Sequence, residues 1–331
     1  MIRRLALTLA LLALAACRGP APDARLEQVF IPKGATLRAV SESLAAHQVL
    51  RHPGWFRTLA RVRGAERKVQ AGIYELRQGE RTGTVLRILV EGRGKLVRFT
   101  VPEGETLLGV AEQAEEQLEI AVDSFLAATR DTARLRAAGA EGPSYEGWLH
   151  PETYLVPVAI VPEDLVDLMV RESVALWTPA REAKRDSMGF SRLQVLTLAS
   201  IVEGEALVND ERPVIAGVYL NRLRLRMPLQ ADPTVQYGME LATGARKTRL
   251  LTKDYKFNSP YNTYLFPGLP PGPINSPGTA SIDAVLNPAS VPYLFFVAGP
   301  DRRHVFSRTY REHLVAIRRV REGILPPPEL N

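Results

Sequence analysis

The chain has 331 residues, which is long enough for two domains, each with its own core. Its hydrophobic content of 46% and charged content of 24% are ordinary for a globular protein. The net charge of +6 comes without a basic tail or block, so a solvated surface is the simplest interpretation and no nucleic-acid partner is expected. A single cysteine excludes an intramolecular disulfide and a thiolate metal cluster.

The N-terminus has the pattern of an export signal. Two arginines precede the uncharged, mainly apolar residues 5–16, a run too short for a bilayer, which needs about 20 residues. The sequence LAAC, which ends at Cys17, resembles a bacterial lipobox, whose cysteine is lipidated. Ordinary cleavage after small residues and an uncleaved anchor are the alternatives. We therefore expect residues 1–17 to be a lipoprotein-type signal and anchor, with the body of the protein outside the cytoplasm.

A polar linker at residues 18–27 leads into an internal repeat with an offset of 70 residues. IPKGATLRAVSE begins at Ile31 and VPEGETLLGVAE begins at Val101. In each copy, β-forming residues precede the proline, and Thr36 or Thr106 follows the turn as the cap of an apolar-periodic helix. This strand–turn–helix resembles the opening of a LysM module, a βααβ fold that binds N-acetylated glycans. Duplicated scaffolding that binds nothing is the alternative.

Turn-forming residues divide the rest of the chain. Between the copies, residues 72–76 predict a strand and residues 82–90 a helix that ends near Gly92. Glycines and a proline near residue 140 mark a break after a helical, charged stretch at 118–138. The expected fold is α+β, with an N-terminal LysM-like α+β domain at residues 28–140 and a mixed, largely helical α+β domain at residues 141–331.

An apolar helix carrying two carboxylates is expected at residues 191–207. Helical periodicity places Glu203 on one face with Leu196 and Ala199, while Glu205 points roughly the opposite way. An ionised carboxylate is costly to bury, so Glu203 must be partnered, protonated or facing a cleft. The alternative is a glutamate that merely sits where the helix reaches the surface.

Further elements follow this helix. The pattern predicts a helix at 212–224, then a turn and a short helix in which Asp232 is the cap and Pro233 the first residue. Residues 257–278 contain 6 Pro and 3 Gly among four aromatic rings, a composition typical of a functional loop. Other helices are expected at 163–177, 281–286 and 308–321, and strands at 293–298 and 304–306.

The sequence lacks the motifs of several common catalytic mechanisms. The five histidines show no His-x-x-x-His spacing, which argues against a zinc hydrolase. Gly-x-Ser-x-Gly, Ser-x-x-Lys and phosphate-loop motifs do not occur. No metal or cofactor is therefore expected. Carboxylate chemistry remains, and it fits glycosidic bond cleavage, in which a glutamate shielded by apolar walls keeps its proton.

Five segments together resemble the endolytic murein transglycosylase (YceG-like) family. They are YEGWLHPETY (145–154), LASIVEGEA (198–206), IAGVYLNRLRLRMPLQADPTVQYG (215–238), SPYNTYLFPGLPPGPI (259–274) and FFVAGPDRRHVFS (295–307). The resemblance implies that Glu203 is the catalytic glutamate and that Glu205 occupies a second, non-catalytic position. It also implies a lytic reaction on peptidoglycan that leaves 1,6-anhydro-N-acetylmuramic acid ends, an inner-membrane anchor facing the periplasm, and association with cell-wall synthases.

The sequence departs from the family pattern at three positions. Gly204 stands where Lys is common, His150 replaces a usual Phe, and Arg302 replaces a common Gly. None of them is the proposed acid, although the last two could alter the wall of the site.

The substrate-binding candidates are amide-bearing, aromatic or acidic side chains: Asn221, Gln230, Tyr237, Tyr261, Asn262 and Glu146. Ordinary capping and packing are the alternatives for each. The rings of residues 145–154 fit either a sugar platform or a buried aromatic corner. A hydrolytic muramidase, with Asp232 or Glu146 as its second carboxylate, and a non-catalytic glycan-binding scaffold are the rival functions.

Overall fold

The computed structural model describes residues 20–21 and 24–323, which divide into two compact units. Unit 1 comprises the chain up to Phe99 together with Tyr154–Val161, and unit 2 comprises Thr100–Thr153 together with the chain from Pro162 onward. The anchor expected at residues 1–17, with Cys17, lies outside the described residues. Within the described part, no helix is long and apolar enough to cross a membrane. The second repeat copy falls in unit 2, and the predicted domain boundary near residue 140 stays a prediction.

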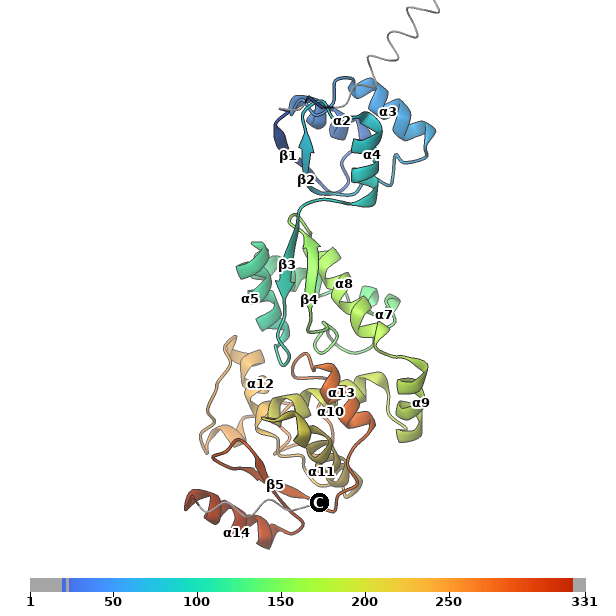
Figure 1. The fold of residues 1–331 in the computed structure, drawn as a ribbon. Coiled ribbons are helices and arrows are strands. Elements are labelled where there is room, and N and C mark those ends of the chain that lie inside the picture. Colours follow the sequence, from blue (N-terminus) through green and yellow to red (C-terminus); the bar gives the residue numbers. More distant parts are fainter. Residues whose placement is uncertain (1–19, 22–23, 324–331) are drawn as a thin grey trace, which may run out of the picture. The chain divides into compact units, whose positions relative to one another are not determined.

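Unit 1 begins with a strand, two helices and a second strand. Its elements are β1 (Leu26–Ile31), α2 (Leu37–Ala46), α3 (Pro53–Val62), β2 (Gly72–Arg77) and α4 (Thr82–Glu91) (Figure 1). β1 and β2 pair antiparallel, with Leu26 opposite Arg77. Thr36 Oγ1 accepts a hydrogen bond from the Ala39 N–H at 3.2 Å, as its predicted role as a cap requires. Gly92 ends α4 at φ +65°, a left-handed conformation that suits glycine.

A second pair of strands, β3 and β4, lies mostly within unit 1. β3 (Leu96–Thr100) precedes the second repeat copy, and β4 (Thr153–Pro157) follows the aromatic segment 145–154. The two strands are hydrogen-bonded neighbours, and the Phe99 and Tyr154 rings stack with their centroids 6.3 Å apart. Pairing therefore joins segments that lie more than fifty residues apart in the sequence.

Unit 2 is largely helical. Its helices are α5 (Leu107–Leu118), α6 (Val122–Ala128), α7 (Thr132–Ala137), α8 (Pro162–Ala175), α9 (Pro179–Met188), α10 (Arg192–Glu205), α11 (Arg212–Arg224), α12 (Asp232–Thr243), α13 (Thr279–Leu286) and α14 (Tyr310–Arg321). Short 3-10 helices lie at Asn209–Glu211 and Asp254–Lys256. β5 (Phe295–Ala298) and β6 (His304–Ser307) form an antiparallel hairpin. The mixed α+β class expected from the sequence is confirmed.

Helix α10 is the central element of unit 2. It packs against α11, α12 and α13, and Val195–Val202 is buried without interruption. Ser191 begins the helix with a capping box, because its hydroxyl accepts from the Gln194 N–H and the Gln194 side chain accepts from the Ser191 N–H. A well-capped, buried helix is a rigid support for a side chain near its C-terminal end.

Some local expectations were wrong. Asp232 does not cap α12: the N-cap is Ala231, and the Asp232 carboxylate accepts hydrogen bonds from the Tyr255 and Tyr264 hydroxyls. The stretch 118–138, predicted to be helical, contains α6 and α7. Helix α9 was not predicted because it buries none of its residues and so has no apolar stripe to read.

The rings of residues 145–154 form a buried aromatic corner. Trp148 is fully buried and donates from Nε1 to the Glu141 carbonyl at 2.7 Å, and Tyr145 donates to the Asp131 carbonyl at 2.8 Å. Tyr154 is 5% exposed. Since these faces are covered, the sugar-platform interpretation of this segment has no support.

Candidate active site

Glu203 lies in the last turn of α10 and points into the protein, with a side-chain exposure of 7%. Its Oε2 accepts hydrogen bonds from the Gly278 N–H at 3.0 Å and the Ser281 hydroxyl at 2.9 Å. Gly278 is the N-cap of α13, so Oε2 lies where the helix dipole favours negative charge. The proline-rich loop predicted at 257–278 therefore ends directly on this carboxylate.

The other oxygen of Glu203 is held by an arginine. Arg212, the first residue of α11, places Nη2 2.8 Å from Glu203 Oε1, and its side chain is only 8% exposed. The same guanidinium donates to the Ser281 hydroxyl and, from Nε, to Asn209 Oδ1 at 3.2 Å. The expectation of apolar walls around Glu203 was wrong, because the carboxylate is neutralised by a buried cation and by oriented dipoles.

A second carboxyl group borders the same residues. A Cβ built on Gly278 would lie 1.9 Å from Glu103 Oε1, so the Glu103 carboxyl rests against the Gly278 backbone. A Cβ at the neighbouring Gly104 would lie 3.7 Å from Glu203 Cγ. Burial raises the pKa of the Glu103 carboxyl, the charge of Glu203 raises that pKa further, and Arg212 opposes the shift. Glu103 as a whole is exposed to solvent.

Backbone pairing holds Glu103 in place. The Gly104 N–H donates to the Ser276 carbonyl at 2.9 Å, and the Ser276 N–H donates to the Glu105 carbonyl at 2.7 Å. Gly104 has φ +82°, a conformation that favours glycine. The turn of the second repeat copy is therefore fixed to the end of the proline-rich loop.

Glu205 points away from Glu203, as helical periodicity predicts. It accepts a hydrogen bond from the Tyr219 hydroxyl of α11 at 3.0 Å. Burial raises the pKa of Glu205 to about 7, although the hydrogen bond from Tyr219 opposes the shift. The two carboxylates of this helix thus have separate partners.

Three substrate-binding candidates form a buried cluster. Glu146 is 3% exposed and accepts from the Leu107 N–H at 3.0 Å and from the Tyr237 hydroxyl at 2.9 Å. The rings of Tyr237 and Tyr261 meet edge to face at 4.8 Å. Burial raises the pKa of Glu146 to about 7. This cluster holds the start of α5 and thereby supports the segment that carries Glu103.

The three amide candidates lie in other surroundings. Asn221 donates to the Val291 and Tyr293 carbonyls at 2.8 and 3.0 Å. Asn262 is fully buried and donates to the Tyr255 and Phe257 carbonyls. Gln230 is exposed and adopts φ +51°. The structure brings none of these amides to Glu203, and a role for them in binding stays a prediction.

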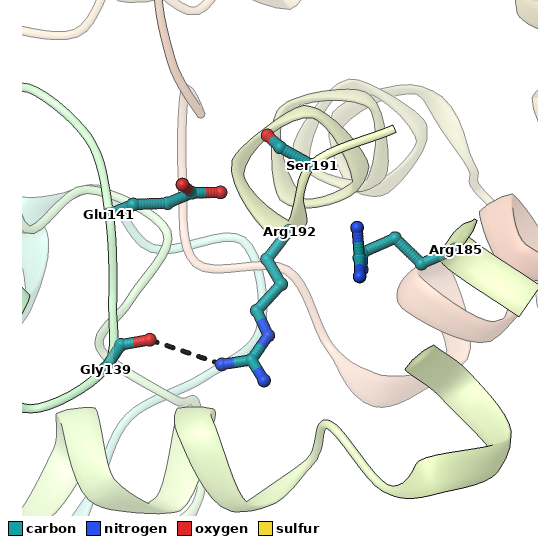
Figure 2. A pocket seen from close by; sticks show the side chains of 5 residues that line it. All are labelled: Gly139, Glu141, Arg185, Ser191 and Arg192. Carbon is teal, nitrogen blue, oxygen red and sulfur yellow. Dashed lines mark hydrogen bonds between the residues drawn. The ribbon is translucent and has the colours of Figure 1, made fainter. Parts of the chain in front are cut away.

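A polar pocket lies at the other end of α10 and is lined by Gly139, Glu141, Arg185, Ser191 and Arg192 (Figure 2). Arg192 donates to the Gly139 carbonyl at 3.2 Å, and both arginines bind Glu182. The pocket surrounds the first residues of α10, whereas Glu203 lies eleven residues further on, roughly 16 Å along the axis. Its charges are already neutralised, so the candidate site is the one around Glu203.

Sequence reasoning missed four members of this site: Glu103, Arg212, Gly278 and Ser281. Arg212, Gly278 and Ser281 lie within or beside predicted elements, but nothing in their local pattern marks them. Glu103 had a usable signal, because the first repeat copy has Lys33 at the matching position. A charge reversal between otherwise similar copies indicates a residue with a different neighbour.

Glu203 is thus a buried glutamate at the end of a helix in a mixed α+β fold, held by Arg212 and by the N-terminus of α13. The chain belongs to the YceG-like family, whose model matches residues 29–319. The resemblance inferred from the sequence is thereby confirmed.

Similarity to individual proteins agrees with this family assignment. The chain is 33% identical over 303 residues to the endolytic murein transglycosylase of Bacillus subtilis, with 86% of this chain and 82% of the relative covered. It is 27% identical over 314 residues to the protein of the same name from Streptococcus pneumoniae, of which the match spans 56%. A crystal structure of a yceG-like protein from Listeria monocytogenes matches with a TM-score of 0.60 and 28% identity, covering 88% of this chain and 99% of the other.

Proposed function

We propose that this chain is an endolytic lytic transglycosylase that cleaves the bond between N-acetylmuramic acid and N-acetylglucosamine in nascent peptidoglycan strands. The observation that carries the proposal is Glu203, a carboxylate 7% exposed and bonded to the end of the proline-rich loop. The Bacillus subtilis and Streptococcus pneumoniae relatives, named endolytic murein transglycosylases, support the same reaction class.

Glu203 serves as both acid and base in this proposal. Protonated, it donates to the glycosidic oxygen as the bond to the muramic C1 breaks. As a carboxylate, it then accepts the proton of the muramic C6 hydroxyl, whose oxygen closes on C1 to give the 1,6-anhydro end. Arg212, Gly278 and Ser281 hold the carboxylate form that the second half requires. No cofactor takes part in these steps.

The contacts of two other carboxylates disfavour a hydrolytic muramidase that uses them. Such an enzyme would need a second carboxylate to activate water, and Asp232 and Glu146 were the candidates. Asp232 is bound by two tyrosine hydroxyls, and Glu146 is buried against the start of α5. Neither contacts Glu203. The names of the Bacillus subtilis and Streptococcus pneumoniae relatives favour an enzyme over a non-catalytic scaffold.

Unit 1 is proposed to bind glycan. The order of β1, α2, α3 and β2, with its two strands paired, supports a LysM-like module. A pocket in the same unit is lined by Gln48, Arg51 and Gln78 among others, and we propose that acetamido groups bind there. We further propose anchoring through Cys17 or the apolar segment before it, a location at the inner membrane facing the periplasm, and termination of strand elongation beside cell-wall synthases.

The test is product analysis on uncross-linked glycan strands. Wild-type protein should yield 1,6-anhydro-muramyl ends by mass spectrometry, and Glu203→Gln should yield none. Glu205→Gln is the matched control, because it lies two residues away on the same helix, faces Tyr219 and should leave cleavage near the wild-type rate. Reducing ends would indicate a hydrolase, and activity in Glu203→Gln would overturn the assignment.

A further inference from the structure

The starting observation is a conflict within the site. To act first as an acid, Glu203 needs a proton, yet its two oxygens accept from an N–H and a hydroxyl and contact a guanidinium. All three partners are placed to bind a carboxylate. A neighbouring group that holds a proton would supply the one that the first half of the reaction needs.

Glu103 is the group in place to hold it. Its carboxyl rests against Gly278, whose N–H binds Glu203, so the two carboxyl groups border one residue. The charged groups facing it are Glu203 from α10 and Arg212 from α11. Glu105, on the same turn, faces Arg246, Glu112 and Glu240 instead.

We propose that Glu103 and Glu203 share one proton, which rests on Glu103 while Glu203 is paired with Arg212 and moves to Glu203 for the cleavage step. Two neighbouring carboxyl groups cannot both ionise without repulsion, and environments that separate their proton affinities assign them different roles. The exposure of Glu103 lets its proton exchange with water. This inference rests on the proposed function and supplies the step that it lacks.

The proton balance closes without a co-reactant. The O–H bond of Glu103 breaks as one forms on Glu203, and the Glu103 carboxylate is then stabilised by Arg212. Glu203 gives this proton to the glycosidic oxygen, which keeps the electron pair of the broken bond. It regains a proton from the C6 hydroxyl and returns it to Glu103. Because Glu103 acts through Glu203, it is a positioning residue rather than a catalytic one.

The experiment is a pH profile of strand cleavage for the full chain and its Glu103→Gln variant. We expect kcat near pH 7 to fall about 10- to 100-fold, the alkaline limb to move to lower pH, and KM to change little. Activity should approach that of the wild type at acidic pH, and Glu103→Asp should restore part of the profile. Glu105→Gln, two residues away with other partners, should retain the wild-type profile.

A wild-type profile in Glu103→Gln, or an equal loss at every pH, would overturn the inference. If Glu203→Gln remains active, the proposed function itself is refuted. If Glu203→Gln is inactive but Glu103→Gln has the wild-type profile, only the proposal of a shared proton is refuted. A titration of ¹³C-labelled glutamate carboxyls by NMR provides a measurement independent of turnover. One carboxyl should titrate above the usual range of glutamate and vanish in Glu103→Gln, and the absence of such a signal would contradict the proposal.

Discussion

Replacing Arg212 by Met would test how the site is held together. The change removes the cation that lies 2.8 Å from Glu203 Oε1 while keeping an unbranched apolar stem in a buried position. The carboxylate would keep its hydrogen bonds from Gly278 and Ser281 but would lose its neutralising charge. We therefore expect Arg212→Met to destabilise unit 2 rather than to act only on catalysis.

The size of the effect follows from two limits. Breaking a buried ion pair by removing one partner costs about 3–5 kcal/mol. The orphaned carboxyl can escape by binding a proton, which costs about 4 kcal/mol at pH 7 for a glutamate of ordinary pKa. A loss of about 3–4 kcal/mol at pH 7 is thus expected, equivalent to a fall of roughly 10 °C in Tm for a unit of this size. Near pH 4.5 protonation costs little, so most of the loss should disappear.

Urea unfolding at pH 7 and pH 4.5 measures both values. Trp148 and Trp177 report on unit 2, since they are 0% and 7% exposed in the folded chain. Adding Glu203→Gln removes the unpaired charge, so the double variant should be more stable at pH 7 than Arg212→Met alone. A loss below about 1 kcal/mol at pH 7, or one of equal size at both pH values, would refute the reasoning.

Three further changes test single features. Burial raises the pKa of Glu146 to about 7, above its value in the unfolded chain, so the free energy of unfolding should decrease as the pH rises from about 4.5 to 7. In urea unfolding, Glu146→Gln should remove part of this decrease. The same pH dependence in the variant and the wild type would contradict the prediction. Arg302 has φ +66°, so Arg302→Gly should raise Tm through a gain of about 0.5–1 kcal/mol, and a lower Tm would count against strain there. Gly204→Ala should lower the Tm although alanine gains about 1 kcal/mol of helix propensity, because a Cβ at position 204 would lie 2.9 Å from the Pro233 ring. A higher Tm would show that Pro233 moves aside at little cost.

Local patterns predicted the helices well where an apolar stripe or a cap was present. Residues 212–224 form α11 with the expected bounds, and Gly92 ends α4 as expected. Helix α9 has no buried residue, and β4 begins within the aromatic segment 145–154. Neither element therefore shows the hydrophobic periodicity by which it could have been predicted. Prediction failed where tertiary contacts, rather than periodicity, determine the structure.

In the candidate site, too, local patterns predicted one residue and tertiary contacts determine the others. Glu203 was found because a carboxylate in a fully apolar helix is costly and therefore informative. Its partners were missed because Arg212, Gly278 and Ser281 are ordinary residues in their own segments and become a site only through packing. The expected apolar walls were wrong for the same reason: periodicity shows which face is buried, not which charged residue from another helix meets it.

The two repeat copies show how one local motif acquires a second role. Both copies use a threonine to cap a helix, but Thr106 also donates to Glu240 at 2.6 Å. The copies differ most in chemistry just before this cap, where Lys33 and Ala35 of the first copy correspond to Glu103 and Glu105 of the second. The shared positions maintain the strand–turn–helix, so selection on the fold alone does not require two added carboxylates. Glu103 lies beside Gly278 and the charge of Arg246 acts on Glu105, so both added carboxylates have their partners within unit 2.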